Sequence, residues 1–367
     1  RSPKKILVIK LWGLGSLALA GRALLSLRKG HPAASITLLT TPECLPLYAE
    51  NGLYDGTLSL DLDASGSTKD AVGSLATRIT ERGFDLTVNL EGLSDLAALL
   101  AGKSGAPATV GLVGDRGLPE PYTRPVSFLP EGHVEDLFYA CARAAGGAEV
   151  EPGLVRPVLR EKERAFASHL LAGAGVDQYT LLVGLHVGAG PFQRHRAWPV
   201  EKFALLAQFL EEESEYRTVF VGGKEDVRSA DRCLMLMARP GLSFAGGLSL
   251  RETLALLERL HLFIGNDSGP LHLAAALGVA TVGLFGPESP ARVFRRRDER
   301  HAAVYRPRAC SPCTSLLGME QGLCKEGGRC VSDLPVEEVR AVVMDMLDHL
   351  SDPEEPPWAA GAVPNHP

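Results

Sequence analysis

The sequence predicts an α/β protein made of two units of similar size, each with a mainly parallel sheet and helices on both faces. The chain has 367 residues, and because a domain has ~150 residues, two domains are favoured. Short apolar runs alternate with stretches of helical periodicity, and this order is typical of parallel α/β sheets. A segment with Gly and Pro at 146–157 separates the two alternating regions.

The composition excludes several classes of protein. Hydrophobic residues make up 45% of the chain, charged residues 22%, and the net charge is −6. A nucleic-acid-binding protein would normally carry a basic excess, so we expect no nucleic acid partner. No apolar run reaches the ~18 residues of a transmembrane helix. The first residues lack the long apolar core of a signal peptide, so we expect a cytoplasmic protein.

The first half begins with the apolar run Lys5–Leu11, which predicts a buried strand. Further strands are expected at 35–40, 56–60, 84–90 and 109–112, and helices at 16–29, 43–50, 68–82, 94–102 and 134–145. The Gly- and Pro-rich segment 113–130 is expected to be a loop. Right-handed crossovers place the carboxyl ends of all these strands at one edge, where ligands bind in open α/β sheets.

The second half repeats the alternation without a visible sequence repeat. Strands are expected at 180–186, 218–221, 261–264 and 279–285, and helices at 161–173, 200–213, 226–238, 250–259, 271–277 and 335–350. The proline-rich tail 351–367 is expected to be disordered.

The segment Ile264–Pro287 carries the densest functional signal. Asp267 and Ser268 follow a strand and can cap the next helix, whereas Gly269 lets a ligand approach the backbone closely. The amino end of that helix, with His272 in its first turns, has unpaired N–H groups and a positive dipole that suit a diphosphate. The alternative is a well-capped strand–turn–helix without a ligand.

Two further loops are candidates for ligand contacts. After the strand that ends near 186, Gly188 lies in a glycine-rich loop before Arg196, and backbone amides beside a guanidinium can bind phosphate. The alternative is a solvated basic loop. In the segment 221–226, Glu225 or Asp226 can accept a hydrogen bond from a ribose hydroxyl, although acidic residues are also common at helix starts.

These segments, in the order LHVGAG, RAWP, VGGKED and NDSGPLHLAAALG…GLFGP, resemble the C-terminal half of glycosyltransferase family 9. The opening KILVIKLWGLGSLALAGRALLSLRKGHP resembles that family's first strand, glycine loop and helix, so the resemblance covers about 1–350. It implies the GT-B fold, with two Rossmann-like domains and a cleft between them. The expected domains are 1–155, which binds the acceptor, and 156–334, which binds the nucleotide sugar and includes a Cys-rich loop at 308–332. The helix 335–350 is expected to pack back towards the N-terminal domain.

The resemblance also implies a reaction, namely inverting transfer of heptose from ADP-heptose to a lipopolysaccharide core or related acceptor, without a cofactor for catalysis. A lipid-linked or glycan acceptor implies transient contact with the inner leaflet, and the oligomeric state stays open. By position, the residues expected to contact the donor are Gly13, Gly15, Ser16, Gly188, Arg196, Glu225, Asp267, Ser268, Gly269 and His272.

One position departs from the family pattern. The family's first loop commonly reads Gly-Asp, with the Asp as presumed base, but here it reads Gly15-Ser16. A serine hydroxyl cannot accept a proton as a carboxylate does. Glu91 follows the strand 84–90 and is expected at the same edge, and family members with a GLGS loop resemble this chain in that Glu. We therefore expect Glu91 to be the base, with Asp95 as second choice. Alternatively, Glu91 caps the next helix, or the chain binds a donor without transferring it.

Four cysteines, Cys310, Cys313, Cys324 and Cys330, fall within 21 residues. Four thiolates fit a structural Zn²⁺ or iron centre, and related protein heptosyltransferases provide a precedent for iron. Disulfides and free thiols are the alternatives. The basic run Arg292–Arg300 suits anionic lipid or acceptor phosphates, or else is a solvated loop that Asp298 partly neutralises.

Three other functions are alternatives to glycosyl transfer. A sugar-nucleotide epimerase with the same fold, or a catalytically silent sugar-nucleotide-binding protein, would share the donor site. A dinucleotide-dependent oxidoreductase that uses Gly13-Leu-Gly15 is disfavoured because the third glycine of that motif is missing.

Overall fold

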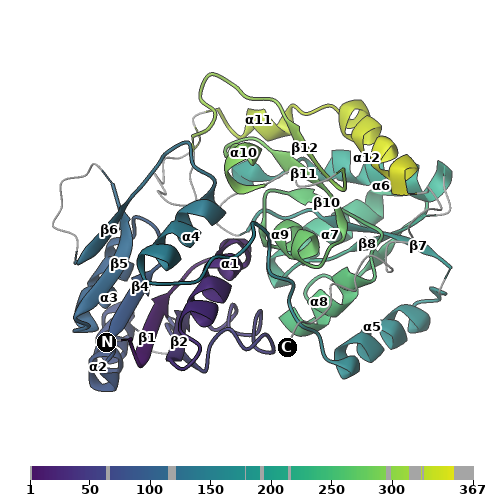
Figure 1. Ribbon diagram of the computed structural model, residues 1–367. Coiled ribbons are helices and arrows are strands. Elements are labelled where there is room, and N and C mark those ends of the chain that lie inside the picture. Colours follow the sequence, from purple (N-terminus) through teal and green to yellow (C-terminus); the bar gives the residue numbers. More distant parts are fainter. Residues whose placement is uncertain are drawn as a thin grey trace. The chain divides into compact units, whose positions relative to one another are not determined.

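The computed structural model of the protein describes residues 2–62, 67–114, 121–177, 179–190, 194–213, 216–294, 299–313, 324 and 326–350. The tail 351–367, Asp298 and residues 314–323 and 325 of the Cys-rich loop lie outside these residues. The described residues form two compact units, one up to Val158 and the other from Leu159 onward. Both units are visible in Figure 1.

The first unit contains a parallel sheet with helices on both faces (Figure 1). Its strands are β1 (Lys5–Ile9), β2 (Ser35–Thr40), β3 (Gly56–Ser59), β4 (Leu86–Asn89), β5 (Ala108–Val113) and β6 (Arg124–Ser127), in the order β3-β2-β1-β4-β5-β6. Its helices are α1 (Leu14–Gly30), α2 (Thr68–Arg82), α3 (Asp95–Lys103) and α4 (Val134–Ala144). The chain runs outward from β1 to β3 and then returns to β4 on the other side of β1, so the switch point of the sheet lies between β1 and β4.

The second unit repeats this topology. Its strands are β7 (Leu181–His186), β8 (Tyr216–Phe220), β9 (Leu242–Ser243), β10 (Leu262–Asn266), β11 (Ala280–Phe285) and β12 (His301–Tyr305), all parallel in the order β12-β11-β10-β7-β8-β9. The helical elements are α5 (Glu161–Gly173), η1 (Arg194–Arg196), α6 (Val200–Glu213), η2 (Lys224–Asp226), α7 (Val227–Leu236), α8 (Leu250–Glu258), α9 (Gly269–Ala276), α10 (Pro290–Val293), α11 (Arg329–Ser332) and α12 (Val336–Leu350). The equivalent switch point lies between β7 and β10.

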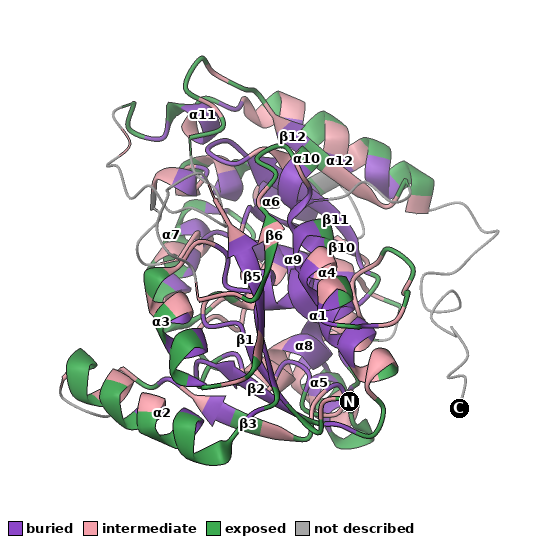
Figure 2. Cartoon of the chain, turned by 60° about the vertical axis from the view of Figure 1, so that its left-hand side comes forward, coloured by how far each residue is buried: buried purple, intermediate pink, exposed green. Residues whose placement is uncertain are grey.

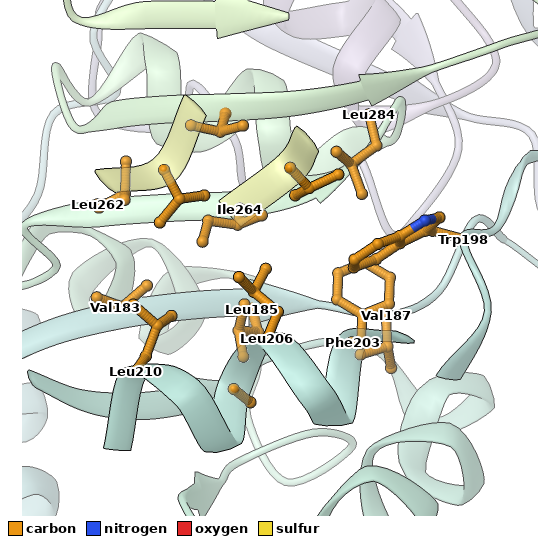
Figure 3. Packing of buried hydrophobic residues seen from close by; sticks show 14 of the residues in the cluster. Val183, Leu185, Val187, Trp198, Phe203, Leu206, Leu210, Leu262, Ile264 and Leu284 are labelled. Atoms are coloured by element: carbon orange, nitrogen blue, oxygen red, sulfur yellow. The ribbon is translucent and has the colours of Figure 1, made fainter. Parts of the chain in front are cut away.

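The central strands are buried on both faces, which explains their continuous apolar runs. Figure 2 shows buried residues concentrated in the central strands, whereas α2 is mostly exposed. In the second unit, the ring of Trp198 packs edge-on against Phe203 with 5.0 Å between centroids, and its Nε1 donates to Leu334 O at 3.0 Å. Figure 3 shows both rings in the same core as Leu185 of β7 and Ile264 of β10. This core supports the loop between β7 and α6.

Three expectations about secondary structure were wrong. The segment 43–50, expected as a helix, forms successive turns, because Pro46 lacks the N–H that a helix interior requires. The expected loop 113–130 contains β6, an edge strand in which Pro125 is tolerated. β9 and β12, two short strands on the outer edges, were not predicted.

The final helix contributes to the core of the second unit. α12 buries four apolar side chains there, namely Val339, Val343, Met346 and Leu347. These residues recur at helical spacing and contact the layer that α6, β11 and β12 form.

Among the described residues, no helix combines the length and the apolar character that a membrane span needs.

Candidate active site

The switch point of the second sheet brings two distant loops together. β7 and β10 are hydrogen-bonded neighbours, so the loops after them start side by side. Asn266 ends β10, and its side-chain Nδ2 donates to Gly188 O at 2.9 Å, while its Oδ1 accepts from the Trp198 amide at 2.9 Å. This amide side chain fixes both ends of the loop in which Arg196 lies. Its role was not predicted, because it depends on neighbours about 70 residues away in the chain.

Arg196 and the turn before α9 lie close together. Arg196 Nη1 lies 3.1 Å from Asp267 Oδ2, and His272 Nε2 lies 3.4 Å from Asp267 Oδ1. All three side chains are buried. Burial raises the pKa of Asp267, but the hydrogen bond from His272 and the charges of Arg196 and His272 outweigh it, so the net pKa is lowered. The carboxylate is therefore ionised at neutral pH and orients two cationic or hydrogen-bonding side chains.

Ser268 occupies the N-cap position of α9 and has extended backbone, but its side chain makes no capping hydrogen bond to the helix. This differs from the alternative in which Ser268 serves only to cap the helix. Its Oγ lies instead 3.0 Å from His186 Nδ1, at the end of β7. The amino end of α9, which begins at Gly269, thus keeps the arrangement of backbone N–H groups that binds anions.

Asp226, rather than Glu225, belongs to this network. Glu225 is exposed, whereas Asp226 is buried, with its Oδ2 3.1 Å from His186 Nε2 and 2.9 Å from the Gly223 amide. Gly188 packs directly on this carboxylate, because a Cβ on Gly188 would lie 1.8 Å from Asp226 Oδ1. The sequence left open which of the two acids contacts the ribose, and the structure shows that the two have different surroundings.

Gly188→Ala should therefore destabilise the second unit. The added methyl group must displace Asp226, and overpacking of this kind costs about 1–3 kcal/mol of unfolding free energy. Urea unfolding measures the loss. The matched control is Gly173→Ala at the end of α5, where an added Cβ meets nothing within 4 Å. Equal stability of the two variants would contradict the close packing of Gly188 on Asp226.

Glu288 is a site residue that sequence reasoning missed. Its side chain is fully buried just after the Gly286-Pro287 turn that ends β11, and its Oε1 accepts from the Ser289 amide at 3.0 Å. Burial raises its pKa, Asp267 adds to this, and Arg292, Ser289 and Arg196 oppose it. Arg292 Nη1 lies 3.4 Å from Glu288 Oε1, so this arginine faces the buried cluster rather than a lipid surface. The Arg295–Asp298 part of the basic run lies outside the described residues.

The switch point of the first sheet holds Glu91. Its Oε2 accepts from Lys10 Nζ at 2.7 Å, from the Trp12 amide at 3.1 Å and from the Leu11 amide. These donors lie in the loop from β1 to α1, just before Gly13, which has a φ of 82° and is the N-cap of α1. The alternative that Glu91 caps α3 is wrong, because Ser94 is the N-cap. Lys10, which is buried, was not predicted.

The other candidates in this unit differ in exposure. Gly15 and Ser16 are buried in the first turn of α1, which has no acidic side chain. Asp95 is exposed at the start of α3. Of the two predicted carboxylates, Glu91 therefore contacts the loop between β1 and α1, and Asp95 is exposed. In the family this loop commonly carries an aspartate.

Of the four clustered cysteines, Cys310 and Cys313 precede residues 314–323, which lie outside the described residues, and Cys324 and Cys330 follow them. Cys313 and Cys330 each have a pKa raised first by burial and then by the charges of neighbouring cysteines, so the thiols lie near one another. Within the ranges that the structure describes, however, no three His, Cys, Asp or Glu side chains are arranged to hold a metal ion. Residues 314–323 and 325, between these cysteines, are outside those ranges.

Two doubly wound units, each with polar side chains at its switch point, define a Rossmann-like α/β protein of the GT-B class. The family model of glycosyltransferase family 9 (heptosyltransferase) matches residues 72–322. The chain therefore belongs to glycosyltransferase family 9.

Sequence relatives are heptosyltransferases. The chain is 24% identical over 303 residues to lipopolysaccharide heptosyltransferase 2 of Escherichia coli K12, which covers 78% of this chain and 84% of that protein. It is 26% identical over 169 residues to lipooligosaccharide heptosyltransferase 2 of Campylobacter jejuni, which covers 45% of this chain. The match spans only about half (51%) of that Campylobacter protein's length.

Solved structures with similar folds include a family 9 protein and heptosyltransferases. The glycosyl transferase family 9 protein of Veillonella parvula has a TM-score of 0.76 at 24% identity, over 94% of this chain and 97% of that one. ADP-heptose LPS heptosyltransferase II of E. coli has a TM-score of 0.71 at 20% identity, over 94% and 99%. The dodecameric iron-containing heptosyltransferase TibC, solved with ADP-D-β-D-heptose, has a TM-score of 0.58 at 14% identity, over 95% and 77%. At these identities the structures support the fold.

Proposed function

We propose that the protein is an inverting glycosyltransferase that transfers heptose from ADP-heptose to a lipopolysaccharide core or related acceptor. The observation that carries this proposal is the convergence of Arg196, Asp267, His272 and Ser268 at the amino end of α9. Family membership and the names of the relatives support the sugar and the nucleotide.

The donor site would act on the leaving diphosphate. Negative charge builds up on the diphosphate as the bond to the sugar breaks, and fixed N–H donors stabilise it where it develops. The amides at the start of α9 and the guanidinium of Arg196 are such donors, and each is typically worth ~3 kcal/mol of barrier. Asp267 acts as a positioning residue, because it is bonded to both Arg196 and His272. Asp226 or Glu225 would lie near the ribose.

Glu91 would be the base that accepts the proton of the acceptor hydroxyl. The three donors on Oε2 hold the side chain in one orientation. The proton would then go to Oε1, the carboxylate oxygen away from Lys10. Gly13, Gly15 and Ser16 would line the same part of the site, since they follow directly on the amides that Glu91 binds. In this arrangement Glu91 takes over the role that the family's aspartate has at the position of Ser16.

A transfer assay tests this proposal. The full chain is incubated with ADP-heptose and a heptose-deficient lipopolysaccharide core acceptor, and the product mass and anomeric configuration are determined. We expect a mass increase of one heptose, with inversion, and no transfer from UDP- or GDP-sugars. An altered sugar nucleotide in the absence of acceptor would indicate an epimerase, and binding without turnover would indicate a silent binding protein. Either result would contradict the proposal.

We propose further that the enzyme works in the cytoplasm with its lipid-linked acceptor at the inner leaflet. The acceptor's lipid anchor, rather than a membrane-spanning helix, would bring the two together. No nucleic acid is expected as a partner.

The cysteines supply another prediction. We propose that Cys310, Cys313, Cys324 and Cys330 together hold one structural Zn²⁺ or iron ion, a donor set that suits either metal. No step of the transfer is assigned to this ion. Elemental analysis of purified protein should give about one metal per chain, and a Cys310→Ser, Cys313→Ser double variant should lose it. The control is Cys141→Ser, whose buried thiol lies in the first unit. A metal-free, fully folded wild-type sample would contradict the site.

A further inference from the structure

Three polar side chains form a hydrogen-bonded chain at the second switch point. Ser268 Oγ lies 3.0 Å from His186 Nδ1, and His186 Nε2 lies 3.1 Å from Asp226 Oδ2. The three come from different elements, namely the N-cap of α9, the end of β7 and η2. His186 and Asp226 are 3% and 5% exposed, whereas Ser268 is half-buried. The serine end of the chain is therefore the end most exposed to a ligand.

Asp226, at one end of this hydrogen-bonded chain, determines which ring nitrogen of His186 carries a hydrogen. Burial raises the pKa of Asp226, but the hydrogen bonds from His186 and from the Gly223 amide oppose it, and the net pKa is lowered. An ionised carboxylate only accepts hydrogen bonds, so His186 Nε2 must carry the hydrogen. In a neutral imidazole, Nδ1 is then an acceptor, and Ser268 donates its hydroxyl hydrogen to it. In this state the serine presents only lone pairs to a ligand.

A diphosphate requires the opposite arrangement. Its oxygens are acceptors at neutral pH, so Ser268 can bond to them only by donating its hydrogen. Once His186 is protonated, Nδ1 becomes a donor to Ser268 Oγ, and the hydroxyl hydrogen can turn to the diphosphate. The hydroxyl then accepts from the imidazolium and donates to the phosphate at the same time.

We infer that binding of a nucleotide sugar at Ser268 is coupled to the uptake of one proton by His186, which Asp226 holds in place. This inference rests on the proposed function and deepens it, since His186 and Asp226 become positioning residues for the diphosphate. The proton comes from solvent, stays on Nδ1 while the diphosphate is bound, and returns to solvent when the diphosphate leaves. No other bond forms or breaks in this step.

The surroundings of His186 favour this coupling. The ionisable groups on the elements packed against it are Asp226, Lys224 and Glu225 on η2, and Asp267 after β10 with its partners Arg196 and His272. The amino end of α9 is the positive end of a helix dipole and disfavours an imidazolium next to it. A bound diphosphate supplies negative charge at the same place and reverses this preference. Protonation and binding therefore strengthen each other.

Calorimetry of the full chain tests the inference. ADP-heptose is a suitable probe because both phosphates are esterified and do not titrate near neutral pH. At about pH 8, titrations in HEPES and in Tris give the number of protons taken up from the difference in buffer ionisation heat. We expect about one proton per ADP-heptose bound. The affinity for ADP-heptose should also fall by up to about tenfold for each unit by which the pH rises in this range.

Variants locate the proton. His186→Gln keeps an amide that can donate to Asp226 but cannot be protonated, so proton uptake and the pH dependence of affinity should disappear. Ser268→Ala, at a half-buried position, should also abolish the uptake. The matched control is His261→Gln at the opposite end of β7, where His261 Nδ1 accepts from the Leu182 amide at 3.0 Å. This control should keep the uptake.

The outcomes distinguish a failure of the proposed function from a failure of this inference alone. If ADP-heptose does not bind, the proposed function is overturned and this inference with it. If it binds without proton uptake, or if uptake persists in His186→Gln or Ser268→Ala, the inference alone is overturned.

Discussion

Arg196→Ala is expected to lower kcat/KM for heptose transfer by about 100- to 1000-fold, the usual effect of removing one donor that stabilises developing negative charge. The same change leaves the buried Asp267 carboxylate without its guanidinium, and breaking a buried ion pair costs about 3–5 kcal/mol of stability. Steady-state kinetics and urea unfolding measure the two effects separately.

Arg196→Lys distinguishes catalysis from packing. The resemblance implies that family members carry Lys or Arg at this position, so the lysine variant should retain activity to within about tenfold, with a point charge in place of the guanidinium fork. The matched control is Arg217→Ala at the start of β8, which removes an arginine 2.9 Å from the buried Glu211 of the same unit. An Arg196→Ala variant as active as Arg217→Ala would show that Arg196 does not act on the diphosphate.

Glu91→Gln is the second change with a large expected effect. If Glu91 is the base, kcat should fall by about 10²- to 10⁴-fold. The amide has nearly the same volume, and its oxygen can still accept from the Leu11 and Trp12 amides. It leaves Lys10 without its carboxylate, however, and an uncompensated buried charge also destabilises the fold. The single variant by itself therefore does not separate a chemical role from a structural one.

The double variant Lys10→Met, Glu91→Gln makes this separation. It removes both charges of the pair, so stability should return towards the wild-type value, whereas turnover should stay low. Recovery of turnover together with stability would identify Glu91 as an anchor of the β1–α1 loop and not as the base. Asp95→Asn, at the exposed start of α3, tests the second candidate with no buried partner to disturb.

The sequence predicted the regular elements well where pattern and boundary signals agreed. α2, α5 and α6 have the predicted bounds, because an apolar face at helical spacing is bounded by capping residues or proline. The edge strands β6, β9 and β12 were missed since they are short and only partly buried. Their identity depends on the neighbouring strand and not on a local apolar pattern.

The same limit applies to the site. Asp267, Ser268 and Arg196 carry local signals, a capped turn and a basic glycine-rich loop, and the strand order brings them together. Lys10 and Glu288 carry no such signal, because the first lies at the end of an apolar run and the second follows a turn. Each becomes recognisable only through a partner far away in the chain or through complete burial.

A crystal structure of the full chain with ADP would show directly where the diphosphate binds. We expect phosphate oxygens within hydrogen-bonding distance of the Gly269 amide, the Ser268 hydroxyl and the Arg196 guanidinium, with Asp267 still bonded to Arg196. A diphosphate bound elsewhere, with these groups bonded only to one another, would contradict this expectation.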